Sequence, residues 1–258
     1  MTWTTRPRFR RGPLATIEAG EGRSVVLIHG VGLRAEAFSA QANALASVAR
    51  VMSIDLPGHG ESPAQPADSL ADYTDVVAQV WPERCIVIGH SMGAVIALDL
   101  ALRYPKVIAG IVALNAIFER SSEASVAVQA RANALDGVTP ADPTVTLTRW
   151  FGDAPSPERE ACARWLTDVD PAAYKSAYTA FAHHDGPDRA ALSSLDIPTL
   201  FITGEDEPNS TPAMSRTMAD LARQGTARIV AGAAHMMPMT HPGEVNAHLL
   251  SFLETCPH

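Results

Sequence analysis

The sequence predicts an α/β fold, in which a mostly parallel sheet is flanked by helices and a helical cap is inserted between two strands. Two observations lead to this prediction. Short runs of β-branched and other apolar residues alternate with longer segments whose apolar residues recur at helical spacing, which is typical of strand–helix units and a parallel sheet. Between about residues 118 and 191 the strand pattern disappears, and it returns afterwards.

Seven segments have the pattern of strands. Residues from about 8 to 20 form a loose strand pattern that ends at a glycine-containing turn. The other runs are short, apolar and rich in β-branched residues, as buried parallel strands are. They cover residues 24–28, 51–54, 86–88, 107–114, 198–203 and 228–230. Helices are expected over residues 38–48, 70–81 and 95–102, and after Thr211-Pro212 and Pro242.

The segment 118–191 is expected to contain about four helices. In three places an N-cap residue precedes a proline, which suits the first helical position because an N–H there would have no partner within the helix. These pairs are Asp142-Pro143, Ser156-Pro157 and Asp170-Pro171. We therefore predict an α/β core of residues 1–117 and 192–258 and a helical cap of residues 118–191.

Aromatic residues are frequent in the cap segment, among them Trp150, Phe151 and Trp165. A helical insertion of this length between two strands can cover a pocket at the end of the sheet and select substrates there. We therefore expect these three side chains to be candidate walls of a substrate-binding pocket.

The composition limits the classes of partner. The chain has 258 residues and a net charge of −8, which argues against nucleic acid or an anionic membrane as the main partner and leaves a small-molecule substrate. No apolar run approaches the roughly 18 residues needed to span a bilayer. Four N-terminal arginines are expected to lie on a solvated strand edge: Arg6, Arg8, Arg10 and Arg11.

Three cysteines, Cys85, Cys162 and Cys256, are odd in number and widely spaced. This pattern is expected of a cytoplasmic protein without disulfides. The sequence has no metal-binding spacing and no phosphate-binding loop, so we expect no metal and no cofactor. Whether the protein is a monomer or a homodimer stays open.

The sequence around Ser91 carries the clearest functional signal. A β-branched run ends at Gly89 and an apolar helical pattern begins after Gly93, so the serine lies on a sharp strand-to-helix turn. The two glycines allow strand and helix to approach closely. We expect the turn to lift the Ser91 hydroxyl above the sheet edge, beside the N–H groups that open the helix.

Five motifs that occur in order along the chain carry a family resemblance. They are His29-Gly30-Val31-Gly32, Asp55-Leu56-Pro57-Gly58-His59-Gly60, Gly89-His90-Ser91-Met92-Gly93, Gly204-Glu205-Asp206-Glu207-Pro208 and Gly232-Ala233-Ala234-His235-Met236. With them the chain resembles an α/β-hydrolase with a helical cap, over nearly its whole length. The nearest resemblance is to small bacterial esterases, enol-lactonases and C–C bond hydrolases.

The residues and the resemblance together suggest how a catalytic site is built. A serine hydroxyl becomes a good nucleophile when a neighbouring imidazole takes its proton. His235 ends the last strand, at the sheet edge that also carries Ser91, and is therefore the expected base. The resemblance implies that two backbone N–H groups hold the oxyanion: that of Met92, after the nucleophile, and that of Val31, in an earlier loop. It also makes His59 a structural residue.

The acid of the triad is where the sequence departs from the family pattern. The resemblance implies an aspartate at the fourth place counted from Gly204, but this place holds Glu207. A glutamate can also hold an imidazole N–H and stabilise its positive charge. Asp206, one residue earlier, and Glu119, just past the strand before the cap, remain alternatives.

These residues predict a cofactor-independent serine hydrolase that cleaves a small carboxylic ester or lactone through an acyl-enzyme. Three alternatives remain open. The same site could hydrolyse a C–C bond of a diketone-type ring-cleavage product, could serve a non-catalytic ligand receptor, or could support cofactor-free oxygenation. The sequence favours the hydrolase because the serine and both oxyanion elements are present.

Overall fold

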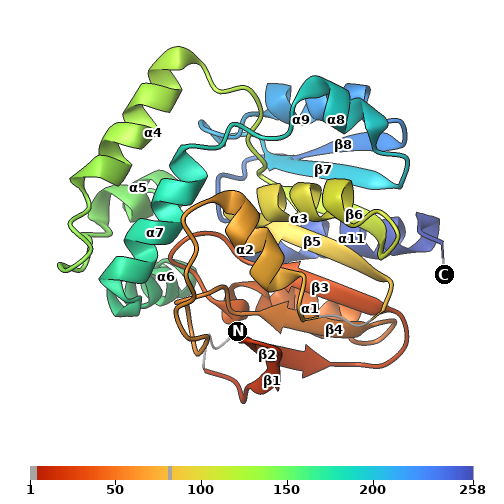
Figure 1. Cartoon of the computed structure of the whole chain (residues 1–258), viewed down its shortest axis with the longest axis horizontal. Helices are drawn as coiled ribbons and strands as arrows, with labels where there is room; N and C mark the ends of the chain where they lie inside the picture. Colours follow the sequence, from red (N-terminus) through yellow and green to blue (C-terminus); the bar gives the residue numbers. More distant parts are fainter. Residues whose placement is uncertain (1–4, 81–82, 258) are drawn as a thin grey trace.

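The structure, a computed structural model, describes residues 5–80 and 83–257. A sheet of eight strands runs through the centre of this part of the chain (Figure 1). The strands are β1 (Phe9–Arg11), β2 (Leu14–Ala19), β3 (Ser24–Ile28), β4 (Arg50–Ile54), β5 (Cys85–His90), β6 (Ile108–Leu114), β7 (Thr199–Gly204) and β8 (Gly225–Val230). Their order is β1-β2-β4-β3-β5-β6-β7-β8. Neighbours pair in parallel except β1 with β2 and β2 with β4, so the predicted mostly parallel sheet is confirmed.

Helices cover both faces of the sheet. On one face lie α2 (Leu70–Val77), α3 (Met92–Arg103) and α9 (Pro212–Leu221). On the other lie α1 (Ser39–Leu45) and α11 (Pro242–Thr255). Two short helices, η1 (Ala35–Phe38) and α10 (Met237–Thr240), lead into α1 and α11. The helix expected over residues 70–81 ends at Val77, and residue 81 lies outside the described residues.

Strand β5 shows why the central strands are apolar throughout. Cys85 and Val87 belong to the apolar cluster on one face of the sheet, whereas Ile86 and Ile88 belong to the cluster on the other. Every residue of the strand is buried, because successive side chains point to opposite faces and helices cover both. The strand thus places Ser91, directly beyond its end, near the middle of the sheet edge.

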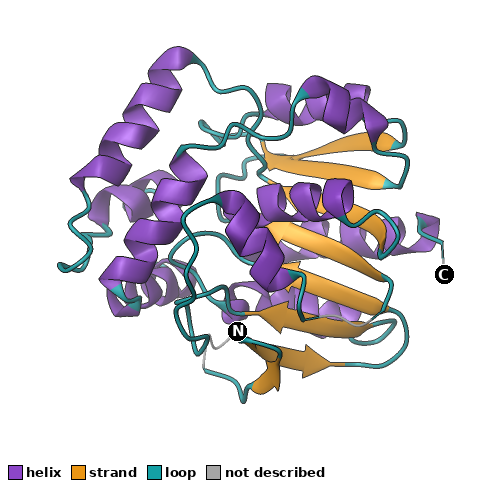
Figure 2. Ribbon diagram, viewed as in Figure 1, coloured by secondary structure: helices purple, strands orange, loops and turns teal. Residues whose placement is uncertain are grey.

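The segment between β6 and β7, all of whose residues are described, is helical as expected. The four helices expected within residues 118–191 are α4 (Ser122–Ala134), α5 (Thr144–Phe151), α6 (Pro157–Asp168) and α7 (Pro171–Ala182), and a fifth, α8 (Arg189–Ser194), begins at the end of this range. Helices α4 to α7 gather at one end of the sheet (Figure 2), whereas α8 contacts α9. Residues 118–191 remain our proposal for a cap, and its boundary at 191 falls inside α8.

Two of the three predicted helix starts have the expected geometry. The side chains of Ser156 and Asp170 each accept a hydrogen bond from the backbone N–H three residues on, at 3.1 and 2.9 Å. Helix α5 begins one residue later than predicted, at Thr144. There the Asp142 carboxylate accepts from the N–H two residues on, at 2.9 Å, and forms a turn before the helix.

Arg8 corrects the expectation that the N-terminal arginines are solvated. Its side chain is 4% exposed, and its guanidinium donates to Asp55 and to Glu36, each at 2.7 Å. Both carboxylates are buried, which is tolerated because the charges are paired. Asp55 also accepts from the backbone N–H groups of Ala35 and Glu61. This ion network therefore fixes the loops that follow β3 and β4.

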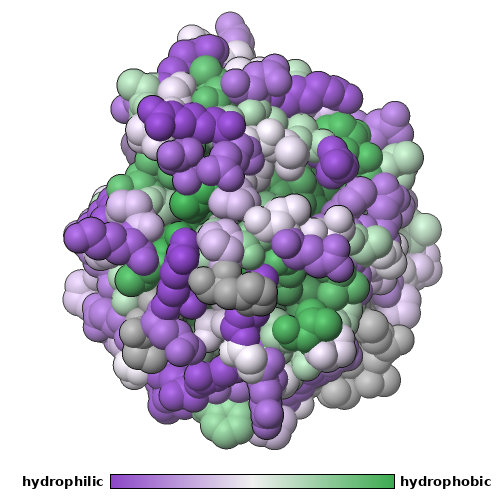
Figure 3. Space-filling model, turned by 90° about the vertical axis from the view of Figure 1, so that its right-hand side faces the viewer, coloured by the Kyte–Doolittle hydropathy of each residue, from purple (hydrophilic) through white to green (hydrophobic). Residues whose placement is uncertain are grey.

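No helix within the described ranges is both long and apolar enough to cross a membrane. On the face that Figure 3 shows, hydrophilic side chains surround separated apolar areas. The three cysteines are free thiols, and all of them are buried.

Candidate active site

Ser91 lies on the sharp turn between β5 and α3. Its backbone has φ 56° and ψ −117°, a left-handed conformation that costs a non-glycine residue on the order of 1–3 kcal/mol and occurs mostly at functional sites. The flanking glycines allow this turn to form. A Cβ atom on Gly89 would overlap the carbonyl oxygen of Gly93, and one on Gly93 would overlap that of Ile28.

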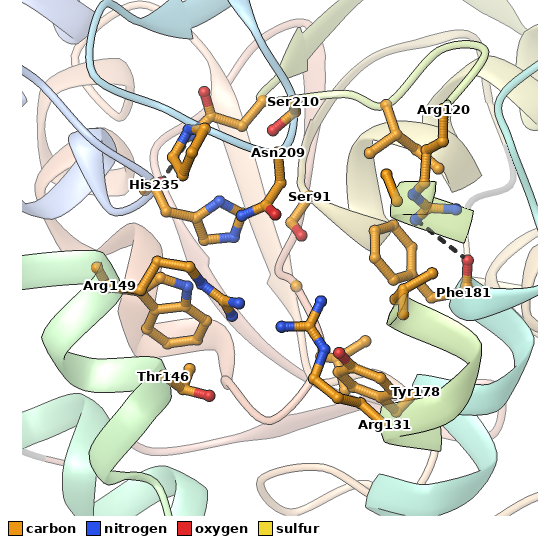
Figure 4. A pocket seen from close by; sticks show the side chains of 18 of the residues that line it. Ser91, Arg120, Arg131, Thr146, Arg149, Tyr178, Phe181, Asn209, Ser210 and His235 are labelled. Atoms are coloured by element: carbon orange, nitrogen blue, oxygen red, sulfur yellow. Dashed lines mark hydrogen bonds between the residues drawn. The ribbon is translucent and has the colours of Figure 1, made fainter. Parts of the chain in front are cut away.

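His235 lies in the loop after β8, and Glu207 holds its ring. The imidazole Nδ1 is 2.9 Å from Glu207 Oε2, and the glutamate side chain is fully buried. The other carboxylate oxygen accepts from the backbone N–H groups of Asn209 and Ser210, at 2.8 and 3.2 Å. Because Nδ1 is engaged, Nε2 is the atom that can exchange a proton. Ser91 and His235 line the same cavity (Figure 4).

The buried carboxylate of Glu207 stays ionised. Burial alone would raise its pKa, because water no longer solvates the charge. The positive charge and hydrogen bond of His235, together with the two backbone donors, outweigh burial and lower the pKa to about 2. At neutral pH the imidazole therefore lies beside a carboxylate and not beside a carboxylic acid.

The structure does not bring the alternative acids to His235. Asp206 is exposed on the turn next to Glu207, and Glu119 forms an exposed ion pair with Arg189 at 2.7 Å. Of the three carboxylates considered from the sequence, Glu207 is the one that contacts the imidazole. The geometry thus favours the position that the family register implied, although its residue type differs.

Two side chains without a predicted role hold the backbone of His235. The side-chain amide of Asn115 and Nε2 of His90 donate to the His235 carbonyl oxygen at 2.7 and 2.8 Å. Asn115 follows β6 with φ 50°, and its side-chain oxygen accepts from the N–H of Gly204 at 3.2 Å. It therefore ties the end of β7 to the loop that carries His235. The one signal for these residues is their place at strand ends on the same sheet edge as Ser91.

The N–H groups of Val31 and Met92, the expected oxyanion donors, are unpaired in the structure described. Met92 is the first residue of α3, and Val31 lies in the loop after β3. Within the described residues, neither N–H has a hydrogen-bond partner, so both are available to a ligand. A Cβ atom on Gly30 would come within 3.0 Å of Ser91 Cβ, which explains why this loop carries glycine beside the nucleophile.

Three histidines near the site are buried and neutral. His59 Nε2 accepts from the N–H of Gly32, and His29 Nε2 accepts from the N–H of Leu56, both at 3.0 Å. A nitrogen that accepts cannot also carry a proton. Burial lowers the pKa of His29, His59 and His90, to about 3 for His29 and for His90. His59 thus braces the loop that contains Val31, which is a structural role.

We expect these histidines to make the protein less stable as the pH falls below about 6.5, their ordinary pKa in the unfolded chain. The folded protein takes up the protons only at lower pH, near 3 for His29 and His90. Because the unfolded state binds more protons in this window, each imidazole lowers the free energy of unfolding by up to about 1.4 kcal/mol per pH unit. Urea unfolding of the wild type and H90Q between about pH 7 and 5 measures this. The variant should show the smaller slope, and equal slopes would contradict the prediction.

A cavity of about 360 Å³ opens over Ser91 and His235, within the size range of small-ligand pockets. Trp150 of α5 lines it and stacks on the His235 ring, with centroids 5.2 Å apart and planes inclined by 18°. Phe151 and Trp165, the other two expected walls, are not among the described residues that line this cavity. They pack in an apolar cluster of α5, α6 and neighbouring residues, to which Trp150 also belongs.

Three arginines from the segment between β6 and β7 line the cavity, and no motif in the sequence predicted a role for them. Arg120 precedes α4, whereas Arg131 and Arg149 lie in the last turns of α4 and α5. Figure 4 shows the guanidinium groups of Arg131 and Arg149 directed into the cavity.

The arrangement of these groups suits nucleophilic acyl transfer. It combines a serine on a strained turn, an imidazole beside an ionised carboxylate and two available N–H donors. The described ranges contain no group of three or more His, Cys, Asp or Glu that could hold a metal ion.

Comparison with known proteins places the chain in a family. Residues 25–248, which include all residues of the site, match the sequence profile of the alpha/beta hydrolase family. The chain belongs to this family. One curated relative of this alpha/beta hydrolase is the (E)-2-((N-methylformamido)methylene)succinate hydrolase of Acinetobacter baylyi. It is 38% identical over an alignment of 258 positions, which covers 93% of this chain and 94% of the relative.

Solved structures confirm the alpha/beta hydrolase fold. A thermophilic esterase from Thermogutta terrifontis superposes with a TM-score of 0.86 at 24% identity, over 96% of this chain and 98% of that one. The enol-lactonase from Burkholderia xenovorans superposes with a TM-score of 0.80 at 24% identity, over 96% and 100%. At this level of identity the likeness shows the fold alone.

Proposed function

We propose that this alpha/beta hydrolase cleaves a small carboxylic ester or lactone through an acyl-enzyme on Ser91. The observation that carries the proposal is the 2.9 Å contact between His235 Nδ1 and the ionised Glu207, in the cavity that also exposes Ser91. An imidazole held in this way can act as a general base for a serine hydroxyl.

In the proposed acylation, Ser91 Oγ attacks the substrate carbonyl carbon while His235 Nε2 takes the hydroxyl proton. The N–H groups of Val31 and Met92 donate to the negative oxygen that forms. His235 then gives its proton to the leaving alcohol oxygen as the C–O bond breaks. Glu207 stays ionised and stabilises the imidazolium.

In the proposed deacylation, water takes the place of the alcohol. His235 removes a proton from the water as its oxygen attacks the acyl carbon, and the same N–H groups hold the second oxyanion. The bond to Ser91 Oγ breaks, the serine recovers its proton from His235, and a carboxylic acid leaves. Trp150, stacked on the imidazole, restricts rotation of the ring during both steps.

Hydrolysis of an N-acyl bond is a second candidate. The Acinetobacter relative that is 38% identical is named for a substrate with an N-methylformamido group. The same serine can attack an amide carbonyl, with His235 protonating the leaving nitrogen. Comparing kcat/KM for short-chain esters, lactones, N-formyl enamines and ring-cleavage diketones separates these candidates and also tests C–C bond hydrolysis. A ligand receptor would turn over none of them.

The proposed nucleophile can be tested before the substrate is known. We expect a fluorophosphonate to inactivate the protein at one molecule per chain and to add its mass to the peptide that contains Ser91, because it reacts with serines activated by a base. S91A should remain unlabelled. Labelling of another residue, or none in the folded wild type, would contradict the proposal.

The cysteines support two further parts of the proposal. Burial raises the pKa of Cys85, Cys162 and Cys256, so these thiols are poor nucleophiles and do not compete with Ser91. The three are free and buried, which fits our proposal of a cytoplasmic location, where thiols stay reduced.

A further inference from the structure

Two arginines of the cap reach toward the proposed catalytic residues. Arg131 and Arg149 belong to the last turns of α4 and α5, helices that border the cavity on different sides in Figure 4. Both residues line the cavity that Ser91 and His235 also line. Their guanidinium groups point into the open space in front of these two side chains.

Neither guanidinium is satisfied by the protein. Among residues 5–80 and 83–257, Arg131 and Arg149 have no hydrogen-bond or ion-pair partner, and the Nε of Arg149 is buried without an acceptor. A buried donor without an acceptor, such as Arg149 Nε, is rare in folded proteins and calls for an explanation. Arg131 is exposed, so water can solvate its guanidinium until a ligand binds. The helix dipole favours a cation in the last turn of a helix. It does not explain why these side chains turn into a cavity.

Arg120, the third arginine of the lining, shows the contrast. Its side chain is 5% exposed and donates to the Asp185 carboxylate at 2.9 Å and to the His184 carbonyl oxygen at 2.6 Å. The charge of Arg120 is therefore paired within the protein. Arg131 and Arg149 are the two cationic side chains of the described lining that remain available to a ligand.

The rest of the lining supplies no opposite charge. Of the 24 described residues that line the cavity, three are arginine and none is aspartate, glutamate or lysine. The whole chain has a net charge of −8, so the positive charge in the cavity is a local feature. Two cations that share one cavity repel each other and attract an anion, and the guanidinium fork matches the geometry of a carboxylate.

We infer that Arg131 and Arg149 bind a carboxylate of the substrate, which is therefore an anionic acyl compound with at least one carboxylate away from the bond that reacts. This inference rests on the proposed function, since it takes Ser91 and His235 as the reacting groups. A neutral acyl compound of the same shape would leave the buried Nε of Arg149 without an acceptor. Such a site discriminates strongly against the analogue that lacks the polar group.

Two matched esters test the inference by turnover. Monomethyl succinate carries a carboxylate, and methyl 4-methylpentanoate has an isopropyl group in its place. We expect kcat/KM to favour the anionic ester by at least about tenfold, since hydrogen bonds to a charged group are strong. R131Q and R149Q should each reduce that preference by about tenfold. R149K, which keeps the charge, should retain part of it. R216Q, on the exposed side of α9, should retain all of it.

A second readout does not depend on turnover. Succinate, but not the neutral succinamide, should raise the melting temperature of S91A and should slow fluorophosphonate labelling of Ser91 in the wild type. Either arginine substitution should weaken both effects, and R149K covers the case in which R149Q does not fold.

The two readouts separate failure of this inference from failure of the proposed function. If Ser91 is labelled but neither succinate nor the anionic ester is preferred, the carboxylate site is overturned and the hydrolase stands. If Ser91 is not labelled while succinate binds through the arginines, the proposed function fails and the carboxylate site stands.

Discussion

Replacing Ser91 with alanine should lower kcat for the best substrate by about four to six orders of magnitude, because the reaction loses its covalent nucleophile. The fold should persist, because serine already adopts the left-handed backbone conformation at this position (φ 56°) and alanine adopts it at a similar cost. Steady-state kinetics and the melting temperature of S91A, measured side by side, check both expectations.

A second serine-to-alanine substitution controls for effects on kcat that any loss of a serine hydroxyl would cause. Ser194 is exposed on α8, and its hydroxyl bonds only to a backbone carbonyl of the same helix among the described residues. S194A should keep wild-type kcat. Near-full turnover by S91A, with the melting temperature unchanged, would show that no acyl-enzyme forms on this serine.

Replacing Glu207 with glutamine should lower kcat by about four orders of magnitude, the loss seen when the triad acid of a serine protease is changed to its amide. The amide is neutral and cannot stabilise the imidazolium, and its NH₂ group can bind the wrong tautomer of His235. Because the pKa of Glu207 is lowered to about 2, the wild-type carboxylate is ionised over the whole usable pH range. The kcat of E207Q at neutral pH measures this effect.

Two further substitutions, D206N and E207D, test whether Glu207 and not its neighbour is the acid of the triad. D206N should change kcat less than about twofold, because Asp206 is exposed and surface changes usually have small effects. E207D should keep partial activity, since the charge survives while the side chain becomes one methylene shorter. A large loss in D206N with little loss in E207Q would move the acid to Asp206. Small losses in both would show that His235 works without a fixed acid.

Much of the fold could be predicted because the sheet is covered on both faces. Strands buried in this way must be apolar at every position, so runs such as Ile86 to Ile88 stand out in the sequence. The helix starts at Ser156 and Asp170 could also be predicted, because capping is a local interaction. The burial of Arg8 was not, because its carboxylate partners lie 28 and 47 residues away in sequence.

The candidate site also has residues that the sequence predicts and residues that it does not predict. Ser91, His235 and Glu207 could be placed from strand ends and family register, since strand ends at one sheet edge meet in space. Arg131 could not, because polar and apolar residues are spread around α4 without a clear face. The direction of Arg131 and Arg149 depends on how the cap helices pack. In the same packing Trp150, Phe151 and Trp165 share one apolar cluster, and of the three Trp150 also lines the cavity.

The most direct test of the central claim is to capture the acyl-enzyme itself. The protein is mixed with p-nitrophenyl acetate, quenched in acid within the first turnover, and analysed by intact and peptide mass spectrometry. We predict one acetyl group on the peptide that contains Ser91, formed in step with a burst of p-nitrophenolate, and none in S91A. Turnover of the ester with no acyl adduct on Ser91 at any quench time, or an equal adduct in S91A, would contradict covalent catalysis by this serine.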